Sequence, residues 1–363
     1  MIDRTTVEVY QRSAVAYAEA RSADAAGRAE EFASRLPPGG VRLDLGCGPG
    51  HYLPHLARGG PVVAVDAAPA MVAEARRRHP GTPGVACDLG ALPLRPGALA
   101  GVWASKSLQH LPRDALPLAL AGLHRALGVG GVLDLTVFAG DGELRSGEDD
   151  EFPGRHYTWW RPEPLTDLLV GAGFTLDEAP ADPGDHRHAR LTARATRART
   201  LPDTVGPGMR LLLCGLNPSL YAADAGIGFA RPGNRFWPAV RAAGLATVDR
   251  DPDRALLDHG LGMTDLVKRA TVAAAELRTE EYRAGLARVE RLVAWLRPGA
   301  VCFVGLAGWR AAVDRRARPG VQPDGLGGVP VYVMPSTSGL NAATPLAALV
   351  DHLRAAAALA DGR

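Results

Sequence analysis

The sequence predicts an α/β protein of two domains, each built on a largely parallel sheet. The chain has 363 residues, more than one ordinary α/β domain contains. Apolar runs of strand length alternate with helical segments in both halves, as βαβ units require. Two of these runs end in polar turns that contain glycine, at residues 41–50 and 211–219. Because open α/β sheets bind ligands at the carboxyl ends of their strands, both turns are candidate sites.

The boundary between the domains is predicted from composition. We expect a doubly wound first domain at residues 1–199, a linker rich in Pro and Gly at 200–208, and a three-layer α/β/α second domain at 209–363.

Several classes of protein are excluded by what the chain lacks. No stretch of about 18 apolar residues occurs, and the charged N-terminus is not a secretory signal, so we expect a cytoplasmic protein with no membrane partner. The cysteines are too widely separated to indicate a disulfide or a zinc site, and His186 and His188 lack accompanying ligands. We therefore expect no metal. The four cysteines are Cys47, Cys87, Cys214 and Cys302.

The net charge of +2 conceals a difference between the two halves. Residues 1–185 carry 17 Lys and Arg against 24 Asp and Glu, whereas residues 186–363 carry 24 against 15. The positive surplus of the second half favours a polyanionic partner. The alternative is that the difference has no function.

The first domain is expected to begin with helices at residues 5–35. A strand at 41–45 then enters a glycine-rich turn, and the next apolar run, 62–66, ends in an acid. This spacing suits a βαβ unit whose carboxylate meets a ribose. Further strands are expected at 85–89, 101–105, 130–137 and 188–195, with a helix at 164–174.

In these motifs the first half, over about residues 10–199, resembles the class I S-adenosylmethionine-dependent methyltransferases that act on small molecules. The resemblance implies S-adenosylmethionine as cofactor. It assigns Gly46, Gly48 and Gly50 to the methionine end of the cofactor. Asp66 would bind the ribose, Asp88 would contact the adenine, and Asp44 would orient the turn. The alternative is a doubly wound domain whose acids only cap helices, and Gly-x-Gly-x-Gly disfavours a nicotinamide cofactor.

The methyl acceptor is not indicated by any motif. The Asp-Pro-Pro-Tyr and Pro-Cys motifs of DNA methyltransferases are absent, so DNA is not the expected acceptor. His110 and His156 are candidate bases by residue type, or packing residues. The aromatic segment 155–161 either covers the acceptor pocket or is an ordinary packed connection.

The second domain begins with the apolar run 211–215, which delivers Asn217 to the edge of the sheet. Further strands are expected within 256–267, at 300–305 and at 329–334, followed by a polar loop and a final helix rich in Ala and Leu.

Three motifs of this half occur in the order found in the mismatch-specific uracil/thymine DNA glycosylases, which it resembles over about residues 205–358. They are Gly-Leu-Asn-Pro at 215–218, Asn-Arg-Phe-Trp at 234–237 and Pro-Ser at 335–336. The resemblance implies hydrolysis of the N-glycosidic bond of uracil, and of thymine or modified pyrimidines, in double-stranded DNA with G·U or G·T mismatches. It implies no cofactor for this reaction, and we expect a monomer.

The resemblance also assigns roles to single residues. Asn217 would position the attacking water, unless it only forms an Asn-Pro turn. Leu216 and Phe229 would form the base pocket, unless Phe229 is a core residue. The segment 234–237 is interpreted as mainly structural.

The late loop is expected to contact DNA. Hydroxyls and backbone donors of Ser336, Thr337 and Ser338 suit phosphates. Leu340, between Gly339 and Asn341, would be a wedge that fills the gap left by a flipped nucleotide. The alternative is that Leu340 folds back onto the final helix.

The sequence thus predicts a methyltransferase-like domain fused to a mismatch-specific glycosylase for base-excision repair. One alternative is a small-molecule methyltransferase whose C-terminal half only binds nucleic acid. Another is that the methyltransferase half serves only as a ligand sensor.

Overall fold

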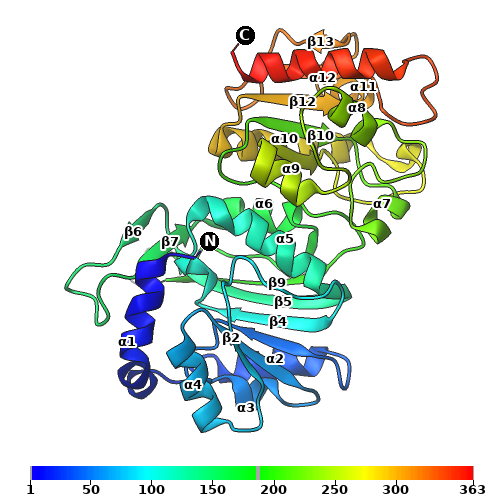
Figure 1. The fold of residues 1–363 in the computed structure, drawn as a ribbon. Coiled ribbons are helices and arrows are strands. Elements are labelled where there is room, and N and C mark those ends of the chain that lie inside the picture. The colour runs from blue at the N-terminus through cyan, green and yellow to red at the C-terminus, as the bar shows by residue number, and fades with distance from the viewer. Residues whose placement is uncertain (1, 185–188, 363) are drawn as a thin grey trace. The chain divides into compact units, whose positions relative to one another are not determined.

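Two α/β units make up the chain, and the fold class predicted from the sequence is confirmed (Figure 1). The computed structural model describes residues 2–184 and 189–362. Unit 1 comprises Met1–Val170 and Phe174–Ala198, and unit 2 comprises Gly171–Gly173 and Arg199–Arg363. His186 and His188 lie outside the described residues.

The sheet of unit 1 is doubly wound around its first strand. β1 pairs in parallel with both β2 and β4, so the chain moves outward first in one direction and then in the other. Strand β9 lies between β5 and β8 and pairs with both of them in the antiparallel direction. Along the sheet the strands are β3 (Gly84–Ala86), β2 (Val62–Asp66), β1 (Arg42–Leu45), β4 (Leu99–Ser105), β5 (Leu127–Ala139), β7 (His156–Trp160) and β6 (Glu143–Arg145). Beside this path lie β8 (Phe174–Glu178) and β9 (Arg190–Arg197).

Amphipathic helices cover this sheet. Phe32 of α2 packs on Trp103 of β4, with ring centroids 5.7 Å apart, and Asp3 caps α1 by accepting a hydrogen bond from the backbone N–H of Thr6. The helices are α1 (Arg4–Ala20), α2 (Ala26–Arg35), α3 (Leu53–Leu56), α4 (Pro69–Arg78), α5 (Leu116–Ala126) and α6 (Pro162–Gly171), with 3-10 turns at Leu108–His110 and Arg113–Ala115.

Two segments of unit 1 differ from the expectation. The strand expected at 85–89 is the short edge strand β3, which ends at Ala86, so Asp88 follows it in a loop. The aromatic segment 155–161 contains strand β7, which pairs with β6 as a hairpin. The sequence pattern did not reveal the hairpin because its first strand, Glu143–Arg145, has three residues and all of them are exposed.

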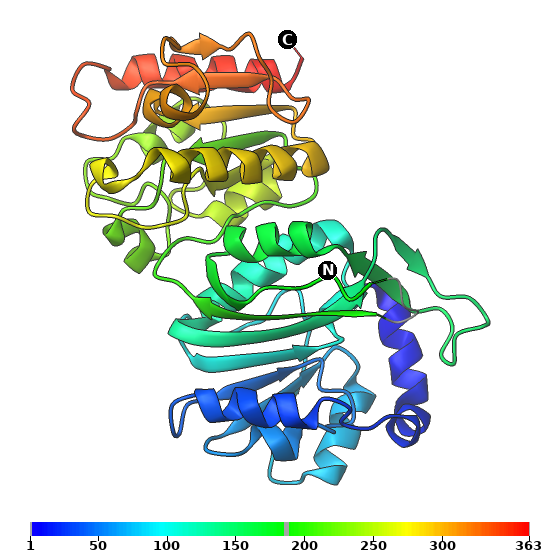
Figure 2. The ribbon, with the colours of Figure 1, turned by 180° about the vertical axis from the view of Figure 1, so that it is seen from behind.

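Unit 2 is a three-layer sandwich around a buried sheet in the order β11-β10-β12-β14-β13 (Figure 2). Alternate strand residues such as Leu213 and Cys302 pack with Phe236 and Leu353 from α8 and α12. The intervening residues therefore face the opposite layer, where Phe303 meets Trp309 of α11 with ring centroids 4.9 Å apart.

The elements of unit 2 follow the expected order. Its strands are β10 (Leu211–Gly215), β11 (Leu261–Asp265), β12 (Ala300–Val304), β13 (Gly320–Val321) and β14 (Val331–Met334). Its helices are α7 (Leu220–Ala225), α8 (Phe236–Ala242), α9 (Pro252–His259), α10 (Thr279–Leu296), α11 (Leu306–Ala312) and α12 (Leu346–Ala360), with a 3-10 turn at Ala274–Glu276.

The segment 200–208, expected as a linker, packs within unit 2. Val205 is fully buried, and Thr204 forms an isolated antiparallel bridge with Met263. Asp203 forms ion pairs with Lys268 and Arg288, at 2.8 and 2.6 Å. The turn-forming residues 206–208 had suggested a linker, but the residues just before them pack against the core of unit 2.

None of the helices in the described part of the chain has the length and hydrophobicity of a membrane-spanning segment.

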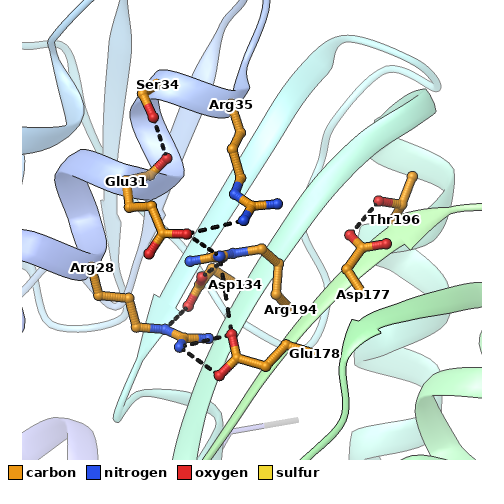
Figure 3. A network of polar contacts seen from close by, with 9 residues as sticks. All are labelled: Arg28, Glu31, Ser34, Arg35, Asp134, Asp177, Glu178, Arg194 and Thr196. Atoms are coloured by element: carbon orange, nitrogen blue, oxygen red, sulfur yellow. Dashed lines mark hydrogen bonds and ion pairs between the residues drawn. The ribbon is translucent and has the colours of Figure 1, made fainter.

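A buried ion network fastens α2 to the sheet of unit 1 (Figure 3). Asp134 of β5 is 1% exposed and accepts hydrogen bonds from Arg28 Nε at 2.8 Å and Arg194 Nε at 3.0 Å. Glu178 pairs with Arg28, and Glu31 with Arg194. Each buried charge is thus held by charges on other elements.

Asp134→Ala is expected to destabilise the protein by about 3 kcal/mol or more, because it leaves the buried Arg194 without its buried counter-charge. The free energy of unfolding in denaturant measures this effect. The control is Asp177→Ala on β8, an exposed carboxylate that accepts a hydrogen bond from Thr196, which should shift stability by about 0.5 kcal/mol or less. Equal losses for the two variants would contradict a structural role for the network.

Candidate functional sites

A cavity of about 900 Å³ opens at the carboxyl ends of β1 and β4 in unit 1. It is lined by the glycine turn after β1, by α1, and by residues of β5 and β7. Its aromatic lining residues are Tyr10, Tyr17, Tyr52, Phe138, Tyr157 and Trp159. The volume suits a small organic ligand, and open α/β sheets bind ligands at this position.

The glycine turn forms one wall of the cavity, and its close packing there requires a residue without a side chain. Gly46 has φ +73°, and a Cβ there would lie 2.2 Å from Ser107 Cβ. Asp66, at the end of β2, accepts hydrogen bonds from the backbone N–H groups of Gly48 and Ala68, both at 2.9 Å. The structure therefore brings the turn and the predicted ribose-binding carboxylate to one wall of the cavity.

Asp44 lies beneath the turn and is 1% exposed. Burial and the neighbouring Asp66 raise the pKa of Asp44 to about 8, so it is mostly protonated at neutral pH. Asp88 behaves differently: its carboxylate accepts hydrogen bonds from the backbone N–H groups of Ile2 and Gly90. Among the described residues its neighbour Leu89 lines the cavity and Asp88 does not, so its contact with adenine stays a prediction.

The two candidate bases are placed in different surroundings. His110 lines the cavity, with Nδ1 donating to the carbonyl of His156 at 2.7 Å and Nε2 accepting from the Tyr10 hydroxyl at 2.8 Å. Arg155 in turn donates to Tyr10 Oη at 3.1 Å. Burial lowers the pKa of His110 to about 4, so the ring stays neutral. The His156 side chain instead lies 3.4 Å from the Glu143 carboxylate.

In unit 2, the Asn217 amide is fixed just beyond the end of β10. Its Nδ2 donates to Thr271 Oγ1 at 2.8 Å, to the Arg269 carbonyl at 3.0 Å and to the Pro218 carbonyl at 3.2 Å. These acceptors identify the nitrogen and direct the amide oxygen Oδ1 away from them. Asn217 is partly exposed, so Oδ1 can accept a hydrogen bond from a water molecule.

Phe229 is held in a rare backbone conformation beside the same strand end. It has φ +58°, which costs free energy for a non-glycine residue. One face of its ring stacks on Phe236, with centroids 3.9 Å apart and planes 17° apart. Trp237 Nε1 donates to the carbonyl of Gly228 at 2.9 Å, which anchors the residue before Phe229. Because one face is covered, a planar ligand can stack only on the other.

Family profiles match both units. The profile described as "Methyltransferase domain" matches residues 43–131, and the profile of the "Uracil DNA glycosylase superfamily" matches residues 202–357. The chain joins a methyltransferase domain to a uracil-DNA glycosylase superfamily domain.

Solved structures similar to this chain include two bacterial proteins. One is 1,6-didemethyltoxoflavin-N1-methyltransferase from Burkholderia thailandensis, with 23% identity over 54% of this chain and 88% of that chain, and a TM-score of 0.43. The other is a TehB-like S-adenosylmethionine-dependent methyltransferase from Corynebacterium glutamicum, with 23% identity over 54% of this chain and 100% of that chain, and a TM-score of 0.41.

Unsatisfied polar atoms show that the methyltransferase cavity suits a polar cofactor. Ser107 Oγ, Gln109 Oε1 and His51 Nε2 are buried, lack a hydrogen-bond partner among the described residues, and belong to side chains that line the cavity. Asp44 Oδ2, under the turn, is also unpartnered. Buried polar groups are normally paired, so such a cluster indicates a ligand that supplies the partners. The residues present therefore fit S-adenosylmethionine.

In the glycosylase-superfamily domain, Arg235 organises the late loop. Its guanidinium donates to the carbonyls of Thr344, Ser338 and Asn341, and its backbone N–H donates to the Thr337 carbonyl. The interpretation of segment 234–237 as structural is thus supported by direct contacts. What the sequence did not show is that this segment holds the loop.

The loop residues differ in what they can offer to DNA. Leu340 is 88% exposed, so it is not folded back onto α12. Gly339 approaches the Gly233 carbonyl so closely that a Cβ would lie 2.9 Å from its oxygen. The hydroxyl oxygens of Ser336 and Ser338 accept bonds from backbone N–H groups, which leaves their O–H groups as donors.

Two side chains of this loop are committed to the protein itself. Asn341 Nδ2 donates to the Ser336 carbonyl at 2.9 Å and to Thr344 Oγ1 at 3.1 Å. Thr337 is 1% exposed, so its hydroxyl, which was expected to contact phosphates, faces the interior.

Leu216, which was predicted in the base pocket, directly follows β10. Its carbonyl accepts a hydrogen bond from the Val267 N–H at 2.9 Å.

One residue of this site was missed. Asp265, at the end of β11, lies within residues 256–267, where only a strand was expected. In the structure it aligns with Gly215 across the strand pair. The available signal was an acid at the end of a strand neighbouring the Asn217 strand.

Proposed function

We propose that the second domain is a mismatch-specific DNA glycosylase that excises uracil paired with guanine, and that the first domain is an S-adenosylmethionine-dependent methyltransferase acting on a small molecule. Thymine and modified pyrimidines opposite guanine are further candidate substrates of the glycosylase. The observation that carries the proposal is the Asn217 amide, whose Nδ2 is bonded to Thr271 and two carbonyls while Oδ1 points elsewhere.

The Asn217 geometry suits a hydrolysis in which the leaving group departs early. As the bond between C1′ of the sugar and N1 of the base breaks, its electron pair goes to the base and positive charge develops on the sugar. A water held by Asn217 Oδ1 then supplies the oxygen that bonds to C1′, and the proton that this water loses passes to the solvent. Since an amide is a weak base, the reaction depends on a base that is stable as an anion, such as uracil.

Phe229 and the late loop supply the binding that this reaction needs. The free face of Phe229 can stack on a flipped pyrimidine, a contact that contributes about 1–3 kcal/mol. Leu340 projects into solvent from a loop that Arg235 fixes at three carbonyls, as a wedge must. The positive surplus of residues 186–363, 24 Lys and Arg against 15 Asp and Glu, favours binding to the DNA backbone.

In the methyltransferase domain, the chain's own residues would bind and orient S-adenosylmethionine. Its sulfonium supplies an electrophilic methyl group. Gly46 lets Ser107 pack closely against the turn, Asp66 offers its carboxylate to the ribose, and Ser107 and Gln109 have polar atoms at the cavity wall that lack a partner among the described residues. The remaining volume, bounded by Tyr157 and other aromatic side chains, would hold the acceptor.

A purely nucleic-acid-binding role for the second domain is disfavoured. Binding requires cations and stacking surfaces, but it does not require a partly buried amide locked by three acceptors beside a strained aromatic residue.

Asn217→Ala is expected to slow excision of uracil from a G·U duplex by about 100-fold or more, because no group would then orient the water. Single-turnover release of uracil measures the rate. The control is Gln322→Ala, which removes an amide that also donates to two carbonyls but lies at strand β13. Equal rates for Asn217→Ala and the wild type would refute the mechanism.

Asp66→Ala is expected to weaken binding of S-adenosylmethionine to the full-length protein by about tenfold or more, because it removes a charged acceptor from the cavity wall. Titration calorimetry gives the dissociation constant. Asp177→Ala, on the exposed part of β8, should bind as the wild type does. If the wild type shows no binding heat, the glycine turn is a structural feature only.

Leu340→Ala is expected to reduce excision from double-stranded G·U DNA much more than from single-stranded uracil DNA, where no gap has to be filled. The ratio of the two rates is the measured quantity. Leu257→Ala on α9, a control with 68% exposure, should leave the ratio unchanged. A parallel loss on both substrates would mean that Leu340 is not a wedge.

A further inference from the structure

Asp265 and Phe229 converge on the same point beside β10. Gly215 has no side chain, and a Cβ built on it would lie 2.3 Å from Asp265 Oδ1 and 3.3 Å from Phe229 Cζ. The Gly215 carbonyl accepts from the Leu266 N–H at 2.9 Å, which fixes the two strand ends together. The carboxyl group of Asp265 therefore occupies space that the absent side chain leaves free, next to the ring on which a base would stack.

The charges around Asp265 are already committed to another carboxylate. Lys268 and Arg288 form ion pairs with Asp203, at 2.8 and 2.6 Å. Arg288 also donates to the backbone carbonyl of Asp265 at 2.9 Å, and not to its carboxylate. Cys214, the residue before Gly215 on β10, is neutral because burial raises the pKa of its thiol. Within the described part of the chain, the Asp265 side chain forms no ion pair.

These surroundings make Asp265 a group that changes its protonation near neutral pH. Burial raises the pKa of Asp265 to about 6; Lys268 and Arg288 oppose this rise, and the negative charge of Asp203 adds to it. Below this value the group is a neutral carboxylic acid that can donate a hydrogen bond. Above it the group is an anion that can only accept one.

The two forms have opposite effects on a departing pyrimidine. The base gains negative charge as its bond to the sugar breaks, and an ionised carboxylate close to the stacking ring would repel that charge. A protonated carboxyl group would instead donate to a base oxygen, and this hydrogen bond would strengthen as the charge develops.

We propose that Asp265 acts in the base pocket as a neutral carboxylic acid that donates a hydrogen bond to an oxygen of the departing base, so that its ionisation slows excision. This inference rests on the proposed glycosylase function. No proton is transferred to the base: the electron pair of the broken bond stays on the base, and the proton stays on Asp265.

The test is the single-turnover rate of uracil release from a G·U duplex between about pH 5 and about pH 8. The wild-type rate should fall above about pH 6, by about tenfold or more at pH 8, as Asp265 ionises. Asp265→Asn should show no such fall and should exceed the wild type by about tenfold at pH 8, because an amide donates at every pH. Asp265→Ala should also lack the fall but should be slower than Asp265→Asn, since it offers no donor.

The matched control is Asp258→Asn, which changes an exposed carboxylate of α9 that pairs with Arg254. Its pH profile should follow the wild type. Thermal melting of each variant checks folding, and Asp265→Ala keeps the test available if Asp265→Asn does not fold.

Three results would overturn the inference. Identical pH profiles for the wild type and Asp265→Asn would mean that Asp265 does not act on the base. A wild-type rate that rises above pH 6 and is lost in Asp265→Asn would make the ionised group a general base. Absence of uracil release by the wild type at every pH would overturn the proposed function and, with it, the role of Asp265, whereas the first two results would leave the function standing.

Discussion

The hydrogen bonds that fix the Asn217 amide are the constraint on which the second site depends. An amide can point either its oxygen or its nitrogen toward a ligand, and only the oxygen can accept a bond from an attacking water. Thr271 and the carbonyls of Pro218 and Arg269 settle this choice before any ligand arrives. An acceptor fixed in advance needs no reorganisation during a reaction, which is how a weakly basic side chain would promote the proposed hydrolysis.

Other contacts in the glycosylase-superfamily domain fix the nearby Phe229 ring and the late loop. Phe229 keeps its unfavourable φ because Phe236 stacks against it and Trp237 holds the adjacent carbonyl. Arg235, which directly precedes Phe236, fixes the late loop by donating to three of its carbonyls. The residues at the start of α8 therefore shape both the proposed base pocket and the loop proposed to meet DNA, and a change there would affect both.

The sequence predicted the parts that depend on local pattern. The buried strands β2 and β10 were recognisable as apolar runs, and Asn217 and the glycine turn were recognisable at strand ends. It did not predict features that depend on contacts distant in the chain. The proximity of Asp265 to Phe229 arises only from strand pairing, and the packing of residues 200–208 arises from ion pairs between Asp203 and Arg288. Strand β6 of the β6–β7 hairpin was not recognisable because it has three residues and all of them are exposed.

The most direct test of this account is a crystal structure of the protein bound to duplex DNA that carries, opposite guanine, a uracil nucleotide made resistant to cleavage by fluorine at C2′. The account predicts that the uracil stacks on the free face of Phe229 and that a water molecule bonded to Asn217 Oδ1 lies on the side of C1′ opposite the base. A uracil that remains stacked in the duplex, or an Asn217 amide turned so that Nδ2 faces the sugar, would contradict it.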